Sequence, residues 1–217
     1  MKTTIFTAMC LGLVLNVIPT QVAASPILSV LPSTQTAILA TPVNVGIRIA
    51  GLGDGTAPSL GAFDLTLSFD PAILAFLSVQ FGDPDIGDQL DLLGLGSLNG
   101  VTPGTGIVSL FELSLDSVDD LDTLQTGMFT LARLQFNTVG VGTSAVNLAI
   151  NALSDSAGGA LTATLENGSV SVTSQPAVPE SGSGVLFLFG FGLILALTRK
   201  ASRNARKSDA CDKWAGS

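Results

Sequence analysis

Residues 60–74 read LGAFDLTLSFDPAIL, and this stretch decides the fold of the 217-residue chain. Apolar and polar side chains alternate from Phe63 to Asp70, and Pro71 follows directly. A two-residue period is typical of a strand with one face in the core and the other in water. An Asp-Pro pair favours a turn, because proline fixes φ and aspartate accepts hydrogen bonds from nearby backbone amides. The stretch therefore predicts a half-buried strand that ends in a tight turn.

The same alternation recurs on both sides of this strand. It covers residues 43–50, 77–81, 107–115, 132–136, 146–150 and 170–172, with Gly, Pro, Asp and Asn clusters between the runs. No segment of this middle region has sustained helical spacing, and we expect its Phe side chains on the core faces of strands. Seven to nine short strands separated by turns predict an all-β antiparallel sandwich or jelly roll.

The composition excludes several classes of function. Hydrophobic residues make up 47% of the chain and charged residues 12%, so the chain is not a disordered protein. The formal net charge of -8 argues against nucleic-acid binding, because an acidic chain repels phosphates. There is no His, the commonest general base and zinc ligand, and 2 Cys are too few for a disulfide framework.

The first 24 residues have the layout of a secretory signal peptide. Lys2 precedes an apolar run over residues 5–18, and small residues lead to Ala24. The run is shorter than the ~20 residues that a membrane span needs. We therefore expect cleavage between Ala24 and Ser25 and export of the remaining chain.

Residues 176–217 have the layout of a membrane anchor. Residues 181–198 contain no charge and would form a helix about 27 Å long, enough to cross the hydrocarbon layer. A basic stop follows, formed by Arg199, Lys200, Arg203, Arg206 and Lys207. Basic flanks stay on the cytoplasmic side, so we expect a transmembrane helix over 181–198, a basic tail over 199–217, and an outward-facing domain before them.

The charge divides along the same boundaries. Residues 25–178 carry two cations and fourteen acids, a net charge of −12, whereas residues 199–217 carry six cations and two acids, a net charge of +4. We predict a signal peptide over 1–24, one acidic β domain over 25–175, and a C-terminal sorting region over 176–217. The β domain has no Cys, so apolar packing must hold it together.

Residues 60–74 resemble the signature strand and turn of cohesin domains. In that family an alternating strand ends in an aromatic-Asp-Pro turn, and an apolar strand then ends in Gly, here Gly82. Residues 131–136 and 168–172 also fit the cohesin pattern, and the resemblance covers most of residues 27–173. It implies a jelly-roll sandwich of about nine strands that binds other proteins, as cellulosomal cohesins bind dockerins, or that sits among carbohydrate-associated modules.

The C-terminal region resembles the PEP-CTERM class of sorting signals. The motif residues are Val178, Pro179, Glu180, Ser181 and Gly182, close to the Val-Pro-Asp-Ser-Gly variant of that class. The resemblance implies that an exosortase, a membrane peptidase, processes the chain. It also implies an intermediate anchored in the inner membrane, followed by release to the cell surface or the extracellular medium.

Two acidic clusters contain the candidate metal ligands. The first is Asp83, Asp85, Asp88 and Asp91, and the second is Asp116, Asp119, Asp120 and Asp122. Clustered carboxylates suit Ca²⁺, which takes about six to eight oxygens in loose geometry, although the spacing of the first cluster departs from the EF-hand pattern. The alternative is that both clusters are solvated loops that keep an exported domain soluble. We expect no other cofactor.

The sequence favours a function without catalysis. Two carboxylates can serve a glycosidase as acid and base, but residues 25–175 contain no Trp, Tyr or His to complete such a site. We therefore predict an exported, surface-sorted, non-enzymatic bacterial protein whose cohesin-like domain mediates protein or matrix interaction in an extracellular polysaccharide or biofilm context. The alternative is a carbohydrate-binding module assisted by calcium, and a third hypothesis is a glycoside-active enzyme.

Overall fold

The computed structural model describes residues 25–175, which form eleven strands and one short helix. The strands are β1 (Ile27–Leu31), β2 (Thr34–Ile38), β3 (Pro42–Ala50), β4 (Leu60–Ser68), β5 (Leu74–Phe81), β6 (Ser97–Gly104), β7 (Ile107–Ser114), β8 (Met128–Thr138), β9 (Gly142–Asp155), β10 (Thr164–Glu166) and β11 (Gly168–Thr173). The helix α1 (Val118–Leu124) lies between β7 and β8 in the sequence. The predicted all-β class is confirmed for this part of the chain.

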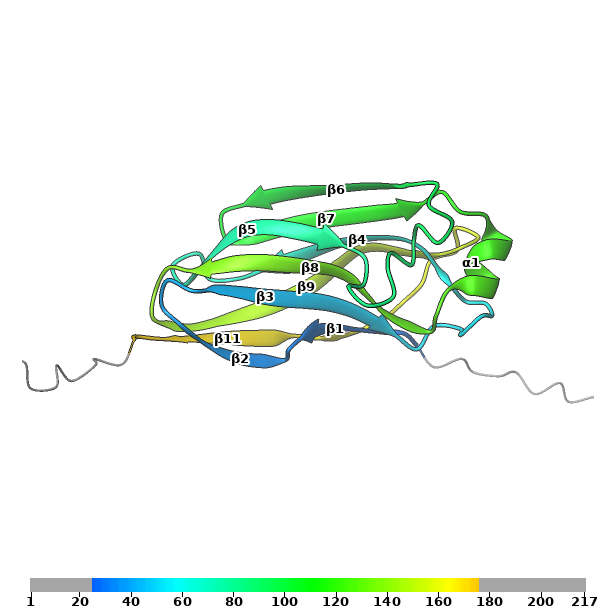
Figure 1. Cartoon of the computed structure of the whole chain (residues 1–217). Coiled ribbons are helices and arrows are strands. Elements are labelled where there is room, and N and C mark those ends of the chain that lie inside the picture. Colours follow the sequence, from blue (N-terminus) through cyan, green and yellow to red (C-terminus); the bar gives the residue numbers. More distant parts are fainter. Residues whose placement is uncertain (1–24, 176–217) are drawn as a thin grey trace, which may run out of the picture. The chain divides into compact units, whose positions relative to one another are not determined.

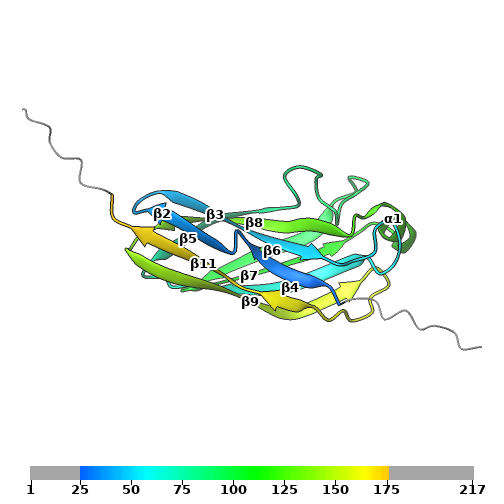
Figure 2. The same cartoon turned by 90° about the horizontal axis from the view of Figure 1, so that it is seen from below.

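The strands form two sheets that lie face to face (Figures 1 and 2). One sheet has five strands in the order β10-β1-β3-β8-β5, and the other has six in the order β2-β11-β9-β4-β7-β6. Helix α1 lies at one end of the sandwich, the end at which residue 25 begins, and residue 175 lies at the opposite end (Figure 1). Two packed sheets bury one face each and leave the other face in water.

The strand count exceeds the predicted seven to nine because the first and last strands are each interrupted and change sheets. Pro32 and Ser33 separate β1 from β2, and Asn167 separates β10 from β11. Proline cannot donate to a sheet ladder, which favours a break at its position. The two interrupted strands remain paired with each other, because β1 pairs parallel with β10 in one sheet and β2 pairs parallel with β11 in the other. If each interrupted pair is taken as one strand, the count returns to nine.

The stretch 60–74 folds as predicted. Strand β4 buries Phe63, Leu65 and Leu67 and turns the alternating polar residues outward. In the following turn the Oδ1 atom of Asp70 accepts a hydrogen bond from the N–H of Ala72 at 2.9 Å. The carbonyl of Asp70 also accepts from the amides of Ile73, just before β5, and Leu74, its first residue. The Asp-Pro turn therefore carries the chain from the six-stranded sheet to the five-stranded one.

An aromatic cluster joins the two sheets near the Asp-Pro turn. The ring of Phe136 on β8 makes edge-to-face contacts with Phe69 at 4.9 Å and with Phe76 at 5.9 Å between centroids. Such arrangements are favoured by the charge distribution of aromatic rings. The prediction that the Phe side chains lie on core faces is wrong for Phe111, which is 42% exposed on β7.

The helix α1 corrects the prediction that the middle region lacks helical structure. At seven residues it is too short for a periodic pattern to reveal it. The hydroxyl of Ser117 caps the helix by accepting a hydrogen bond from the N–H of Asp120 at 3.2 Å. Leu121 is the buried residue of the helix. Asp122 accepts hydrogen bonds from the hydroxyls of Ser59 and Ser156, which fasten the helix to the ends of β4 and β9.

The predicted signal peptide (1–24), sorting motif, transmembrane helix and basic stop lie outside the described residues. Within residues 25–175 there is no helix that is both long and apolar enough to cross a membrane.

Candidate functional site

A row of exposed apolar side chains runs along the outer face of β6 and β7. Ile107, Phe111 and Leu113 on β7 are 46%, 42% and 44% exposed, and Leu98 on β6 is directly opposite Leu113. The ring of Phe111 lies over Gly100 on β6, where a Cβ atom would be only 2.6 Å from the ring. We call Leu98, Ile107, Phe111 and Leu113 the apolar strip. Leu98, Phe111 and Leu113 are neighbours in the register, and Ser109 separates them from Ile107 on the same face. Exposed apolar groups of this kind are typical of interaction sites.

A polar network adjoins the apolar strip on β4 and β9. The side-chain amide of Asn151 donates hydrogen bonds to Oδ1 of Asp64 at 2.9 Å and to Oγ1 of Thr66 at 3.0 Å. The hydroxyls of Thr66 and Ser109 lie 3.1 Å apart. Asp64 is directly opposite Phe111 in the sheet register. The outer face of the six-stranded sheet thus combines apolar anchors with one half-buried carboxylate and fixed hydrogen-bonding groups.

The loop between β5 and β6, residues 82–96, extends the apolar surface at the α1 end. Its side chains of Leu93 and Leu95 are 50% and 64% exposed, and the loop leads directly into β6. Leu115, just beyond β7, is 57% exposed as well. A hydrogen bond joins the loop to the segment after β7, because the backbone N–H of Leu92 donates to the side-chain Oδ2 of Asp116 at 2.7 Å.

The first acidic cluster lies in this β5–β6 loop, but its carboxylates do not converge. Those of Asp83, Asp88 and Asp91 accept hydrogen bonds from backbone amides and fix turns within the loop. Asp85 is exposed, and its backbone N–H donates a hydrogen bond to Oδ1 of Asp83 at 2.9 Å. In the part of the chain that the structure describes, no three acidic side chains come together in a metal-binding arrangement. Calcium binding by these four residues stays a prediction that this arrangement does not favour.

Asp83 is the strongest anchor of the loop. Its Oδ1 accepts from the amides of Asp85 at 2.9 Å and Ile86 at 3.4 Å, and its Oδ2 accepts from the amide of Thr130 on β8 at 2.8 Å. Burial alone would raise the pKa of this carboxyl, but the hydrogen bonds from these amides and from the Thr130 side chain outweigh it and lower the pKa. The loop is therefore tied to the five-stranded sheet by a carboxylate that remains ionised.

Two buried polar side chains near the loop were not identified from the sequence. Gln125, at the end of α1, accepts from the N–H of Leu60 at 2.6 Å and donates to the carbonyls of Leu60 and Gln89 at 3.0 and 2.9 Å. Glu112 on β7 is 1% exposed, and its Oε1 accepts a hydrogen bond from the hydroxyl of Ser97. Neither has a sequence motif, since each acts through residues that are distant in the chain.

The orientation of β7 is the reason that the apolar strip was missed. Residues 107–113 have apolar side chains on both faces of the strand, and the one charged residue, Glu112, suggests that its own face is the exposed one. In the structure that face is buried, with Val108 at 0% and Leu110 at 1%, and Phe111 is on the outer face. Period-two alternation identifies the two faces of a strand but not which of them is covered.

Two open grooves are lined by none of the four residues of the apolar strip. One, of about 540 Å³, lies between β2 and β3 and is lined mainly by amide and hydroxyl side chains, among them Gln35 and Asn44. The other, of about 440 Å³, lies between β5 and the β6–β7 turn and is lined by apolar residues such as Phe69 and Phe76. Neither groove is lined by a titratable side chain, so neither offers an acid or a base to a substrate.

Comparisons with known proteins connect this architecture to solved structures. No family model and no curated protein matches the chain. A non-cellulosomal cohesin from the archaeon Archaeoglobus fulgidus matches with 19% identity and a TM-score of 0.52, over 70% of this chain and 94% of its own. The sixth cohesin of scaffoldin B from Acetivibrio cellulolyticus, solved with a Cel5 dockerin, matches with 18% identity and a TM-score of 0.53, over 69% of this chain and 100% of its own.

A cohesin of Clostridium thermocellum, in the Coh-OlpA–Doc918 complex, matches with 12% identity and a TM-score of 0.55, over 69% of this chain and 100% of its own. At these identities the likeness concerns the backbone arrangement and not individual contact residues. Residues 25–175 thus have a cohesin-like β-sandwich fold.

Proposed function

We propose that this chain is a non-enzymatic protein-interaction module, and that its partner binds the outer face of the six-stranded sheet. The observation that carries the proposal is the apolar strip on β6 and β7, with four side chains between 42% and 57% exposed on one continuous face. Exposed aromatic and aliphatic side chains gain free energy when a partner covers them, and they supply the anchors of most interfaces. The cohesin-like fold supports the same class of function, since the Acetivibrio and Clostridium structures are cohesin–dockerin complexes.

The chemistry of the face defines the partner. Phe111 and Leu113 require apolar side chains opposite them, and Asp64 beside Phe111 requires a cation or a hydrogen-bond donor. The domain carries a net charge of −12 over residues 25–178, which accelerates association with a basic surface and repels an acidic one. The partner is therefore a protein surface with an apolar centre and a basic rim.

Photo-crosslinking in cells that produce the full chain tests this surface. A photoreactive residue in place of Phe111 should give one discrete protein adduct, and the same residue in place of the exposed Asn137, on β8 of the other sheet, should give none. Leu113→Ser should abolish the adduct at position 111. Leu77→Ser is the matched control, because Leu77 is 48% exposed but lies on β5. Equal adducts at positions 111 and 137, or none at either, would contradict the proposal.

Export and surface sorting belong to the same proposal. The support is the signal-peptide layout before Ala24, the motif around Pro179 and Glu180, and the basic stop after residue 198. In this proposal an exosortase-type peptidase processes the chain at the membrane. The domain then acts at the cell surface or outside the cell, within an extracellular polysaccharide or biofilm matrix.

A second candidate function is glycan binding, favoured by the groove between β2 and β3. Its lining offers amide and hydroxyl groups from Gln35, Thr36, Thr41, Asn44 and Thr173, which suit sugar hydroxyls. A glycan array separates the two candidates. Selective retention of one polysaccharide that is lost in Asn44→Ala would favour glycan binding, and a discrete protein adduct at position 111 would favour the first proposal.

A further inference from the structure

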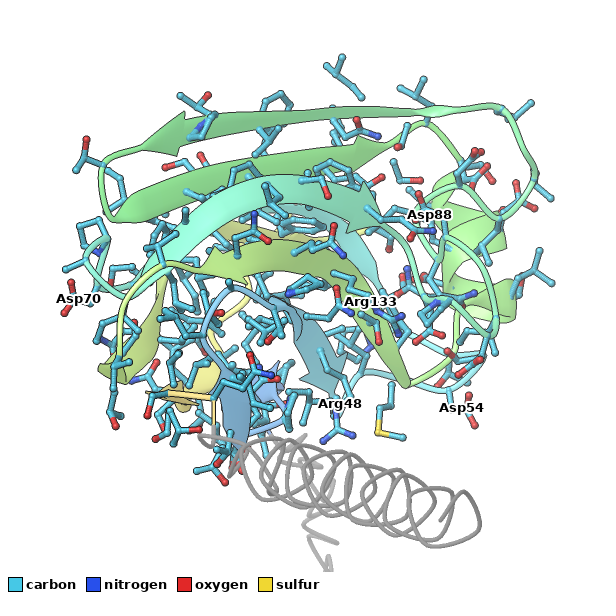
Figure 3. All side chains as sticks on the ribbon, turned by 60° about the vertical axis from the view of Figure 1, so that its left-hand side comes forward. Arg48, Asp54, Asp70, Asp88 and Arg133 are labelled. Carbon is cyan, nitrogen blue, oxygen red and sulfur yellow. The ribbon has the colours of Figure 1, made fainter. Side chains whose placement is uncertain are left out.

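Arg48 and Arg133 are the two cations of residues 25–175, and both belong to the five-stranded sheet. Arg48 lies on β3 and Arg133 on the adjoining strand β8 (Figure 3). The strands of this sheet contain two cations and one acid, Glu166, a net charge of +1. The other thirteen of the fourteen acids lie in the six-stranded sheet, in α1 or in loops. Within the described residues, positive charge therefore predominates on this sheet alone.

The two arginines lie on the same side of the sheet. Arg133 is directly opposite Gly46, and Arg48 is two residues from Gly46 on the same strand. Residues two apart on a strand share a face, and diagonal neighbours of this kind have Cα atoms about 7–8 Å apart. Ile47 and Ile49 occupy the core face of β3, both 0% exposed, so the arginines are on the outer face. Because glycine has no side chain, nothing at position 46 separates the two guanidinium groups.

Within residues 25–175, no ion pair joins either guanidinium group to a carboxylate. Glu166 and Arg48 lie in one row across the sheet, but Ser29 on β1 is between them. Asp83, beyond the other edge, accepts hydrogen bonds from three backbone amides, among them that of Thr130. The Nε atom of Arg48 is buried without a hydrogen-bond partner. A buried donor without an acceptor is unfavourable, so an oxyanion that draws this guanidinium outward would supply the missing acceptor.

The centre of this face is rich in side-chain amide and hydroxyl groups. Gln135 on β8 lies between Asn44 on β3 and Ser78 on β5, and Gln80 is directly opposite Arg133. Asn44 also lines the groove between β2 and β3. Amides and hydroxyls both donate and accept hydrogen bonds, which suits the hydroxyl groups of a sugar. The arginine pair and the groove thus adjoin one polar surface.

The same face offers few anchors to a protein partner. The large exposed apolar side chains on the strands of this sheet are Ile27, Leu77 and Met128. Ile27 and Met128 are the first residues of β1 and β8, and Leu77 lies at the bulge of the edge strand β5. Protein interfaces depend on apolar and aromatic anchors near their centre. A hydroxylated polymer with negative charges matches the centre of this face better than a protein does.

We propose that the outer face of the five-stranded sheet binds an acidic polysaccharide, whose carboxylate groups bind Arg48 and Arg133. A guanidinium group can donate two parallel hydrogen bonds to one carboxylate, so the arginines supply geometry as well as charge. The amides of Gln80 and Gln135 bind sugar hydroxyls beside them. At physiological ionic strength, charges more than about 8 Å apart are largely screened, so acids in other parts of the domain do little to oppose this contact.

The inference rests on the second candidate function, glycan binding, and names the class of glycan. It extends the binding surface from the groove between β2 and β3 onto the sheet beside it. It does not depend on the apolar strip, which lies on the outer face of the other sheet.

Photo-crosslinking of the purified full chain to fluorescently labelled alginate oligosaccharides, which are polymers of uronic acids, tests the site. A photoreactive residue in place of the exposed Ser78 should give a labelled adduct, and the same residue in place of the exposed Asn147, on β9 of the other sheet, should give none. The adduct forms at the face itself, so it does not report attraction to the basic tail. Arg48→Gln combined with Arg133→Gln should reduce the adduct by about tenfold. Glu166→Gln is the matched control on the same sheet and should leave the adduct intact.

Gly46 provides a second test if the double arginine variant fails to fold. A Cβ atom at this position would meet no atom closer than 3.6 Å, so the position has room for a side chain. Gly46→Asp places a carboxylate between the two arginines and should suppress the adduct by competing with the ligand. Gly46→Asn has the same shape without the charge and should give the larger adduct of the two.

Three results would overturn the proposal. They are equal adducts in the native chain and the double arginine variant, equal adducts in Gly46→Asp and Gly46→Asn, and competition by neutral dextran as strong as that by unlabelled alginate. Competition by dextran sulfate without competition by alginate would reject carboxylate as the bound group. An adduct that is lost in Asn44→Ala but unchanged in the double arginine variant would keep glycan binding at the groove and reject the arginine site. Failure of the inference is therefore distinguishable from failure of the function on which it rests.

Discussion

At the scale of single residues, the domain contains two carboxyl groups whose titration affects stability in opposite directions. Glu112 has its pKa raised to about 7 from an ordinary value of 4.5, mainly by burial, whereas hydrogen bonds to backbone amides lower the pKa of Asp83. A raised native pKa means that the folded chain keeps a proton which the unfolded chain releases. A lowered native pKa means that the unfolded chain keeps a proton which the folded chain has released. Each group therefore governs stability in its own pH range.

Glu112 should make the domain less stable as the pH rises. Between pH 4.5 and about 7 the native Glu112 is protonated and the unfolded one is ionised, so the free energy of unfolding falls with pH and levels off above about 7. The slope from this group approaches about 1.4 kcal/mol per pH unit at most. Urea unfolding at several pH values should show the difference from Glu112→Gln, which lacks the group. Parallel pH curves for the two proteins would contradict the assignment.

Asp83 should act at the acidic end of the range. Its stabilising effect is complete above the ordinary value of 3.8 and is lost as the pH falls through the lowered native pKa. Asp83→Asn is expected to reduce the free energy of unfolding by about 1–2 kcal/mol at neutral pH, because the amide group cannot accept from Thr130 as the carboxylate does. The deficit should shrink as the pH falls below the ordinary value of 3.8 and through the lowered native pKa. Asp85→Asn, which removes an exposed charge from the same loop, is the control and should change stability little.

At the scale of elements, Gln125 connects three segments that no sheet ladder joins. It binds both backbone groups of Leu60 at the start of β4 and the carbonyl of Gln89 in the β5–β6 loop, and it ends α1. Gln125→Ala leaves three buried backbone groups without partners and should lower the free energy of unfolding by about 2–4 kcal/mol. Thermal unfolding of the native protein and the variant measures this loss of stability. Gln35→Ala is the control, because Gln35 makes one exposed hydrogen bond, and a loss equal to that of Gln125→Ala would refute the role.

The strands could be predicted from the sequence, but the candidate surface could not. Alternation located β3, β4 and β8, because each has one clearly apolar face. It also located β7 but did not show which face is covered, because both faces are apolar and the buried one contains Glu112. The buried hydrogen bonds of Glu112 and Gln125 join residues far apart in the chain, and such contacts leave no local pattern.

At the scale of the whole molecule, the candidate surface and the C-terminal exit of the domain occupy different places. The β5–β6 loop contacts the segment beside α1, and residue 175 lies at the other end of the sandwich (Figure 1). Any attachment through the residues after 175 therefore starts far from this loop. The apolar strip lies on the outer face of a sheet and not at either end.

The sorting proposal makes a prediction about the whole chain in the cell. Pro179→Ala combined with Glu180→Ala should block processing, so the chain should keep residues 181–198, whose apolar length holds a protein in a membrane. On a blot of fractionated cells, the variant should run more slowly than the native protein and remain in the membrane fraction. Gln175→Ala combined with Pro176→Ala, just before the motif, is the matched control and should be processed normally. If all three proteins run identically in the same fraction, the motif does not direct sorting, and the interaction module must reach its partner by another route.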